Sequence, residues 1–275
     1  MLERSKGITN FQLKYIAMFA MVLDHIHYMF EYTGKVPAWF SVVGRLAAPI
    51  FLFCLIEGFE KTRNQKKYFK TIYLISIVMG AIRFGFYNVL HFAVRSDGFC
   101  PQNAMLSSFV PLLVVLFGLQ NFRQKKYVRG TLLTVIPIIM PFLIIPLYAI
   151  QNELFLFTLN LVNFTVLPVH SFLSDGGTAT LIMGIVIYLF FRKNRIRQLC
   201  AFGITVILWD VLLPLAKGYS ISDLIFHAYE WVEVFAIVPL LCYNGKRGTG
   251  NKWLFYIFYP LHIYVLYGIS LLIYR

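Results

Sequence analysis

The sequence predicts an all-α, polytopic membrane helical bundle with about nine to ten transmembrane helices. Hydrophobic residues make up 59% of its 275 residues and charged residues only 13%, against about 45–50% and about 25% in ordinary soluble domains. The mean hydropathy is +0.70. So few charges cannot cover the surface of a soluble protein of this size, and the solvent for most of the chain is therefore lipid.

The expected helices follow from nine apolar runs of spanning length. In chain order they cover residues 11–32, 39–58, 71–92, 104–121, 131–150, 177–191, 199–216, 222–243 and 253–274. The first run lacks a small-residue cleavage site, so it predicts a retained first span rather than a signal peptide. A further run, 154–167, is too short for a span and carries Asn160 and Asn163.

The distribution of Lys and Arg predicts the orientation of these spans. With the N-terminus in the cytoplasm, 19 of the 25 basic residues lie in cytoplasmic clusters, within residues 4–14, 61–70, 123–129, 192–197 and 246–252. Only four basic residues lie on the opposite side. Because positive residues collect in cytoplasmic loops, this distribution favours a cytoplasmic N-terminus.

Two of these clusters constrain the number of crossings. Placing both 123–129 and 192–197 in the cytoplasm requires an even number of crossings between them, yet three apolar runs separate them. We expect residues 154–176 to re-enter the membrane or to lie at its outer interface. That arrangement has nine crossings and an external C-terminus, and ten crossings with one cluster misplaced is the alternative.

The net charge and the cysteines limit the partners that can be expected. A net charge of +13 would point to nucleic acid in a soluble protein, but here it follows from topology, and no nucleic-acid partner is expected. The four cysteines are far apart and without metal-ligand spacing, so no metal is expected. No linker or separate soluble domain interrupts the chain, and residues 1–275 are therefore expected to form a single integral-membrane domain.

Charged residues inside the predicted spans are the first candidates for function. They are Asp24, Arg45, Glu57, Arg83, Asp210, Glu230 and Glu233. Each costs roughly 2.5–3.5 kcal/mol when it is unpaired at the centre of a span, so we expect them to face one another, water or a ligand. Internal ion pairs that fix the helix register are the alternative interpretation.

Polar stripes accompany these charges. Arg83, Tyr87 and His91 follow one another at i, i+4 and i+8 in one span, and His227, Glu230 and Glu233 follow at i, i+3 and i+6 in another. His170 and Asp175 lie in the region that is expected to re-enter. Under the predicted orientation, nearly all of these groups share one polar chamber in the outer half of the membrane.

The adjacent residues Asp24 and His25 are the strongest catalytic candidates. A carboxylate beside an imidazole raises the basicity of the ring and fixes its tautomer. A single intramembrane histidine is more often a satisfied core residue, and His27 is therefore a weaker candidate.

Several motifs lie in a fixed order between residues 21 and 262. They are Met21-Val22-Leu23-Asp24-His25-Ile26, Gly44-Arg45-Leu46-Ala47-Ala48-Pro49-Ile50-Phe51, Glu57-Gly58-Phe59, Thr62-Arg63-Asn64 running into Lys67-Tyr68, Tyr243-Asn244-Gly245-Lys246-Arg247-Gly248, and Phe255-Tyr256-Ile257-Phe258-Tyr259-Pro260-Leu261-His262. Together they resemble the TraX family of membrane proteins, named for the enzyme that N-acetylates pilin in conjugative systems. The family is also distantly similar to multi-pass membrane acyltransferases.

The resemblance implies a membrane-embedded acetyltransferase of the bacterial plasma membrane, with acetyl-CoA as the donor. His25 would be the general base, and Asp24 would orient it or stabilise its imidazolium form. Arg45 or Arg83 could stabilise the oxyanion, and His262 is a second candidate base. A ping-pong route through an acetylated His25 stays open.

The donor needs cationic partners for its phosphates, and CoA is cytoplasmic. The residues assigned to the donor lie at the cytoplasmic ends of spans that carry the motifs: Glu57, Thr62, Arg63, Asn64, Lys67, Lys246 and Arg247. For each single Lys, plain positive-inside charge is the alternative interpretation.

The sequence does not identify the acceptor, and two functions other than acetyl transfer stay open. His27 stands where the family usually has Gly, Ala48 stands where it usually has Phe, and residues 93–200 match weakly. An amine or hydroxyl of a pilin-like amino terminus, a secreted peptide or an envelope glycan could therefore be the acceptor. A transporter or flippase with charges along a substrate path and a non-catalytic assembly factor are the alternatives, and binding of acetyl-CoA would separate the enzyme from both.

The predicted topology can be tested by labelling single introduced cysteines with a membrane-impermeant reagent. Positions within 61–70 and 192–197 should be protected in intact cells, whereas positions within 93–103 and at the C-terminus should react. External labelling of a cysteine at position 195 would contradict the nine-crossing arrangement.

Overall fold

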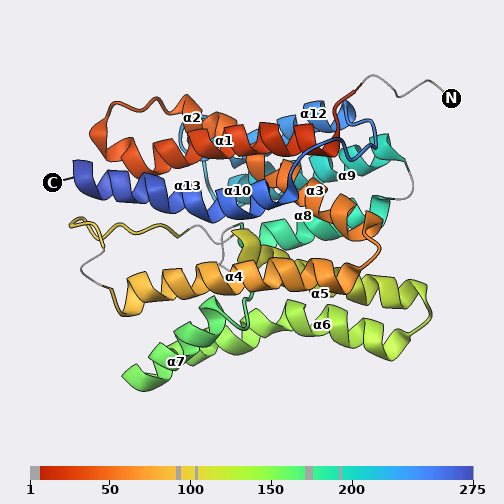
Figure 1. The fold of residues 1–275 in the computed structure, drawn as a ribbon, viewed down its shortest axis with the longest axis horizontal. Helices are drawn as coiled ribbons and strands as arrows, with labels where there is room; N and C mark the ends of the chain where they lie inside the picture. Colours follow the sequence, from red (N-terminus) through yellow and green to blue (C-terminus); the bar gives the residue numbers. More distant parts are fainter. Residues whose placement is uncertain (1–6, 91–93, 103–104, 171–175, 192–193, 275) are drawn as a thin grey trace. The chain divides into compact units, whose positions relative to one another are not determined.

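The computed structural model describes residues 7–90, 94–102, 105–170, 176–191 and 194–274. The described residues are 78% helical and contain no strand, only an isolated bridge between Ile8 and Tyr243. The predicted all-α helical membrane bundle is therefore confirmed (Figure 1).

The chain forms two compact units. Unit 1 is made of residues 1–58 and 186–270, and unit 2 of residues 59–185 and 271–275. That these units form one membrane domain stays a prediction.

The helices of unit 1 come from both ends of the chain. They are α1 (Asn10–Phe30), η1 (Glu31–Thr33), α2 (Trp39–Gly44), most of α3 (Ala47–Lys61), α9 (Arg195–Val206), the π-helical turn η4 (Ile207–Leu212), α10 (Leu213–Ala216), α11 (Ile221–Phe226), η5 (Tyr229–Ala236), α12 (Ile237–Leu241) and most of α13 (Lys252–Ile273). Unit 2 contains α4 (Gln65–Asn88), α5 (Met105–Arg123), α6 (Tyr127–Ile144), η3 (Ile145–Ala149), α7 (Glu153–Phe164) and most of α8 (Gly177–Phe190).

Among the described residues, six helices are long and apolar enough to cross a membrane. They are Trp39–Lys61, Gln65–Asn88, Met105–Arg123, Tyr127–Ala149, Arg195–Ala216 and Trp253–Ile273. The 12 residues of α7 make a helix of about 18 Å at 1.5 Å per residue, too short for a hydrocarbon core of about 30 Å. The 14-residue helix α8 (Gly177–Phe190), in a predicted span, is also short, so the expectation that residues 154–176 do not cross stays a prediction.

The first and last helices run side by side in the same direction (Figure 1). The ring of Phe11 lies 5.6 Å from that of Phe255 near the start of both helices, and the Tyr32 hydroxyl donates to the Ser270 carbonyl near their ends. This parallel packing holds α1 and α13 together within unit 1. The number of crossings and the side that faces the cytoplasm stay predictions.

One predicted span, 222–243, is not a continuous helix. The Ala228 N–H donates to the Asp223 carbonyl instead of the Leu224 carbonyl, and the Trp231 indole donates to Leu224 instead. The chain continues as the eight-residue 3₁₀ helix η5. Because a 3₁₀ helix has three residues per turn, its two glutamates still share one side, whereas His227 of the predicted stripe lies in the break.

Proline interrupts two other spans of unit 1. Pro49 lies in the first turn of α3, where a missing N–H is tolerated, and the helix Trp39–Lys61 is accordingly irregular at Arg45, between α2 and α3. The span after Arg195 passes through η4 before Pro214 in α10. Both interruptions place a charged residue, Arg45 and Asp210 respectively, at an irregular point of its helix.

Close packing in unit 2 depends on a glycine. Gly80 of α4 faces the backbone carbonyl of Phe164 at the end of α7, and a Cβ at this position would overlap that oxygen. Because the obstacle is backbone, neither a rotamer change nor a side-chain shift can remove the overlap.

We expect Gly80→Ala to destabilise the protein, because α7 must move away from α4. Overpacking typically costs about 1–3 kcal/mol, so the thermal unfolding midpoint of the purified protein should fall measurably. Gly85→Ala on the same helix is the matched control, because its Cβ would meet only a leucine methyl at 3.7 Å. Equal midpoints for the two variants would contradict the packing described here.

Candidate functional site

Two buried histidines from opposite ends of the chain meet inside unit 1. His25 of α1 and His262 of α13 are joined by a 2.6 Å hydrogen bond between His25 Nδ1 and His262 Nε2. Their rings are stacked with centroids 4.8 Å apart, and the residues are only 5% and 8% exposed. The structure thus brings together the two histidines proposed as bases from the sequence.

The hydrogen bonds determine which nitrogen of each ring carries the proton. His262 Nδ1 lies 2.7 Å from the Phe258 carbonyl, and because a carbonyl only accepts, Nδ1 must be the donor. In a neutral imidazole the other nitrogen, Nε2, is then the acceptor. His25 must therefore donate from Nδ1, so its lone pair lies on Nε2, the atom that can act as a base.

Asp24, expected from the sequence to orient His25, makes a different contact. Its Oδ1 accepts a hydrogen bond from Ser41 Oγ of α2 at 2.9 Å. Consecutive helix residues point about 100° apart, so sequence neighbours on α1 face different elements. Gly44 of α2 packs against the Asp24 side chain, where a Cβ would overlap it. The ring nitrogen Nδ1 of His25 is paired with His262 instead.

Arg45 lies among three carboxylates of unit 1. Its Nη2 is 3.6 Å from Glu230 Oε1, and both Asp24 and Asp210 interact with it electrostatically. Arg45 Nε and Asp210 Oδ2 are buried without a hydrogen-bond partner among the described residues. The predicted convergence of intramembrane charges is therefore found for these four residues. The side chains of Arg45 and Glu230 are 32% and 46% exposed, so this ion pair by itself contributes little to stability.

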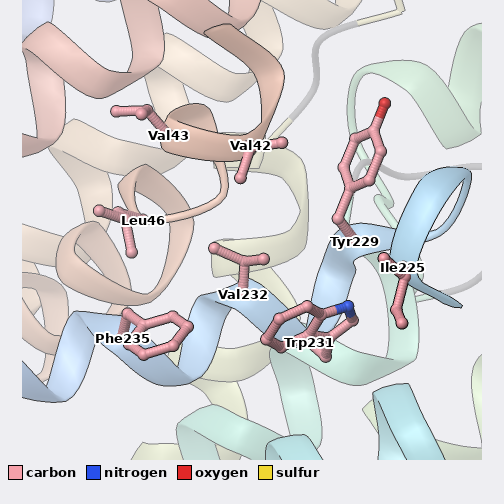
Figure 2. Close-up of a pocket in the computed structure, with 8 residues that line it drawn as sticks. All are labelled: Val42, Val43, Leu46, Ile225, Tyr229, Trp231, Val232 and Phe235. Atoms are coloured by element: carbon pink, nitrogen blue, oxygen red, sulfur yellow. The ribbon is translucent and has the colours of Figure 1, made fainter. Parts of the chain in front are cut away.

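An open apolar groove of about 390 Å³ lies beside this charge cluster. Its lining consists of Val42, Val43, Leu46, Ile225, Tyr229, Trp231, Val232 and Phe235. Figure 2 shows the three residues of segment 42–46 facing η5 across the groove. Arg45 and Glu230 belong to the same two segments, so their ion pair connects the two walls of the groove.

A second polar cluster holds the opposite end of unit 1 together. Glu57 of α3 is only 3% exposed, and its carboxylate accepts from Arg195 Nη2 at 3.3 Å and from the Tyr243 hydroxyl at 3.2 Å. The Arg195 guanidinium lies 4.8 Å from the ring centroid of Phe53 and 4.7 Å from that of Tyr243. We call Glu57, Arg195 and Tyr243 the carboxylate clamp.

Two residues of the predicted basic clusters form ion pairs. In unit 1, Arg195 pairs with Glu57 of α3, as described above. In unit 2, Arg123 pairs with Glu60, with Nη1 3.7 Å from Oε1. The number of crossings between the two clusters stays a prediction.

The motif at residues 243–248 wraps around the start of α1. The Asn10 and Phe11 N–H groups donate to the carbonyls of Lys246 and Arg247. Gly248 has φ +76° and packs against Thr9, the N-cap residue of α1. The loop thus satisfies backbone donors that a helix N-terminus otherwise leaves unpaired, and it leaves the side chains of Lys246 and Arg247 exposed.

The other residues assigned to the donor lie in unit 2. Asn64 caps α4, since its Oδ1 accepts from the Lys67 N–H at 2.8 Å, and this contact explains its place in the motif structurally. Thr62 and Arg63 complete the turn before α4, and the side chains of Arg63 and Lys67 are exposed. The donor role of these residues stays a prediction.

Arg83 also lies in unit 2, where its guanidinium is 4.3 Å from the ring centroid of Phe164 and 5.9 Å from that of Tyr87. His170 is satisfied locally, with Nε2 3.2 Å from the Ile138 carbonyl and Nδ1 3.3 Å from Thr178 Oγ1. His91 and Asp175 of the predicted chamber lie outside the described residues.

The fold and these clusters define a multi-span, all-α membrane protein with a buried histidine pair. The family model described as "TraX protein" matches residues 10–270, so the chain belongs to the TraX family.

A related protein is the "Probable fimbrial assembly protein FimC, serogroup H1" of Dichelobacter nodosus. It is 26% identical over 278 residues, which cover 96% of this chain and 97% of the relative. No solved structure matches the chain.

The carboxylate clamp leads to a stability prediction. Arg195→Ala leaves the buried Glu57 carboxylate without its cation, and breaking a buried pair typically costs about 3–5 kcal/mol. The thermal midpoint should therefore fall steeply. Arg197→Ala is the control, because Arg197 is an exposed residue on the same helix. A comparable midpoint in both variants would show that the clamp does not hold unit 1 together.

Proposed function

We propose that this chain is a membrane-embedded acetyltransferase of the bacterial plasma membrane. It moves an acetyl group from cytoplasmic acetyl-CoA to an amine or hydroxyl of a peptide or envelope-glycan acceptor. The observation that carries the proposal is the buried His25–His262 pair, in which the hydrogen bond between His25 Nδ1 and His262 Nε2 sets the tautomer of His25.

His25 acts as the general base in this mechanism. Its Nε2 takes the proton of the acceptor as the acceptor nitrogen or oxygen bonds to the acetyl carbonyl carbon. The C–S bond of the thioester then breaks, and the imidazolium returns the proton to the leaving thiolate.

His262 orients the base. Its Nε2 accepts the hydrogen bond from His25 Nδ1, which holds the His25 ring in place and stabilises the imidazolium that forms during transfer. This is the function that a carboxylate serves in a Ser-His-Asp triad, here supplied by a neutral ring whose own tautomer is set by the Phe258 carbonyl.

Arg45 is the candidate for oxyanion stabilisation. Its buried Nε has no hydrogen-bond partner among the described residues and is therefore a donor available to the charge that develops on the acetyl oxygen. Asp24 and Glu230 keep the guanidinium in position. Arg83 lies in unit 2 and is the alternative candidate.

The relative's name favours an acceptor connected with fimbriae. A relative named for fimbrial assembly, together with family membership, supports a pilin-like amino terminus over a glycan. The same name also favours the second candidate function, a non-catalytic assembly factor. Mass spectrometry of envelope peptides and glycans, with and without the gene, separates the two: an added acetyl mass that depends on the gene supports the enzyme, and its absence supports the assembly factor.

We expect His25→Ala to lose about 10²–10⁴-fold in transfer rate, the usual cost of removing a general base. Binding of acetyl-CoA, measured by calorimetry on the purified protein, should be retained. A thermal-unfolding scan serves as the control for folding. Near-normal turnover by a folded His25→Ala protein would remove His25 from the mechanism and make His262 the candidate base.

Variants of His262 separate an orienting role from a basic one. His262→Gln keeps an acceptor, its amide oxygen, for the His25 Nδ1 proton, whereas His262→Ala does not. If His262 orients His25, Gln should retain more activity than Ala. Equal loss in both variants would indicate that the imidazole of His262 itself exchanges protons.

A further inference from the structure

Two cations share one aromatic ring at the start of α1. Lys14 Nζ lies 5.7 Å from the ring centroid of Phe11 and 5.1 Å from that of Phe255. The Arg247 guanidinium lies 5.7 Å from the ring centroid of Phe11. Phe11 is only 3% exposed, so both positive groups lie against one buried ring.

The position of Arg247 is built into the backbone. The Arg247 carbonyl accepts from the Phe11 N–H at 3.1 Å, and the adjacent Lys246 carbonyl accepts from the Asn10 N–H at 2.9 Å. Gly250 packs directly on the Phe11 ring, where a Cβ would overlap it. The loop therefore holds the backbone of Arg247 at the start of α1, close to the ring that Lys14 also contacts.

The positive charge of this pair is not neutralised by the surrounding described residues. Neither Lys14 nor Arg247 forms an ion pair with a carboxylate among them, and the two cations repel each other electrostatically. The attractive electrostatic neighbour of Lys14 is Cys54, a thiol that is uncharged at neutral pH at its ordinary pKa of about 8.5. An anion placed between the cations would relieve this repulsion.

We propose that Lys14 and Arg247 form a binding site for a phosphate group. Arg247 is exposed and Lys14 is half-buried, so a ligand can reach both while Phe11 and Phe255 exclude water from one side. Lysine and arginine are the side chains that bind phosphate most often in proteins, Arg through two parallel hydrogen bonds and Lys as a point charge. Lys14 is a new member of the site, because the sequence alone assigned it only to a topological cluster.

Two sources of phosphate fit this chemistry. One is the diphosphate of the donor, an assignment that rests on the proposed function. The other is the headgroup of an anionic phospholipid, which does not depend on it.

The test uses the purified full-length protein in nanodiscs. In the first arm, the discs contain phosphatidylcholine and coenzyme A is titrated by calorimetry. In the second arm, the discs contain phosphatidylglycerol, and retention of that lipid is measured by native mass spectrometry. The control variant is Arg129→Gln, which removes an exposed cation in unit 2. It is compared with three single variants, Lys14→Met, Lys14→Arg and Arg247→Gln, and with the double variant Lys14→Met/Arg247→Gln.

If the pair binds phosphate, Lys14→Met and Arg247→Gln should each weaken binding in one arm by roughly 10-fold or more, the usual effect of losing a charge-assisted contact. Lys14→Arg and Arg129→Gln should bind nearly as the parent does. The double variant should lose less than the product of the single losses, because both groups bind the same anion.

The two arms identify the source. Losses confined to coenzyme A assign the site to the donor, and losses confined to phosphatidylglycerol assign it to a lipid headgroup. If the parent protein does not bind coenzyme A but the lipid effect is present, the phosphate site stands while the proposed function fails. If all variants bind both coenzyme A and phosphatidylglycerol as the parent protein does, the proposed phosphate site is wrong.

Discussion

The buried carboxylate of Glu57 is the constraint on which the rest of unit 1 depends. A carboxylate that is 3% exposed requires a cation and hydrogen-bond donors, because an unpaired charge away from water costs several kcal/mol. Arg195 supplies the cation, and the Tyr243 hydroxyl donates a hydrogen bond. The requirement brings α9 and the segment after α12 to the end of α3. Tyr243 then begins the loop that caps α1, so one carboxylate determines the position of three segments that are distant in sequence.

From that end, the remaining geometry follows by helix packing. The loop fixes where α1 begins, and α13 follows the loop directly, so the two helices start together and run in parallel. Parallel alignment brings His25 and His262 into contact, although 237 positions separate them. The carboxylate clamp and the histidine pair are thus consecutive parts of one arrangement along α1 and α13.

The fold class could be predicted from the sequence, because hydropathy depends on local composition. The partners of the polar residues could not. Asp24 and His25 are adjacent in sequence, and adjacency suggested a pair, but a helix turns about 100° per residue and directs them to Ser41 and His262. Arg195 was indistinguishable from the other positive residues of its loop, because its contact with Glu57 depends on tertiary packing. The break at His227 could not be predicted either. Glu230 and Glu233 are three residues apart, and this spacing places them on one side of a 3₁₀ helix as well as of an α-helix.

The loop around the start of α1 has a consequence for biogenesis. A protein is synthesised from its amino-terminal end, so α1 is made long before residues 246 and 247, whose carbonyls accept from its first N–H groups. The partner of His25 is made later still, at position 262. Domains generally fold in the order of synthesis, but unit 1 can close only after residue 262 has been made. Most of unit 2, encoded between its two parts, is made before then, so α1 must wait with a histidine whose final partner does not yet exist.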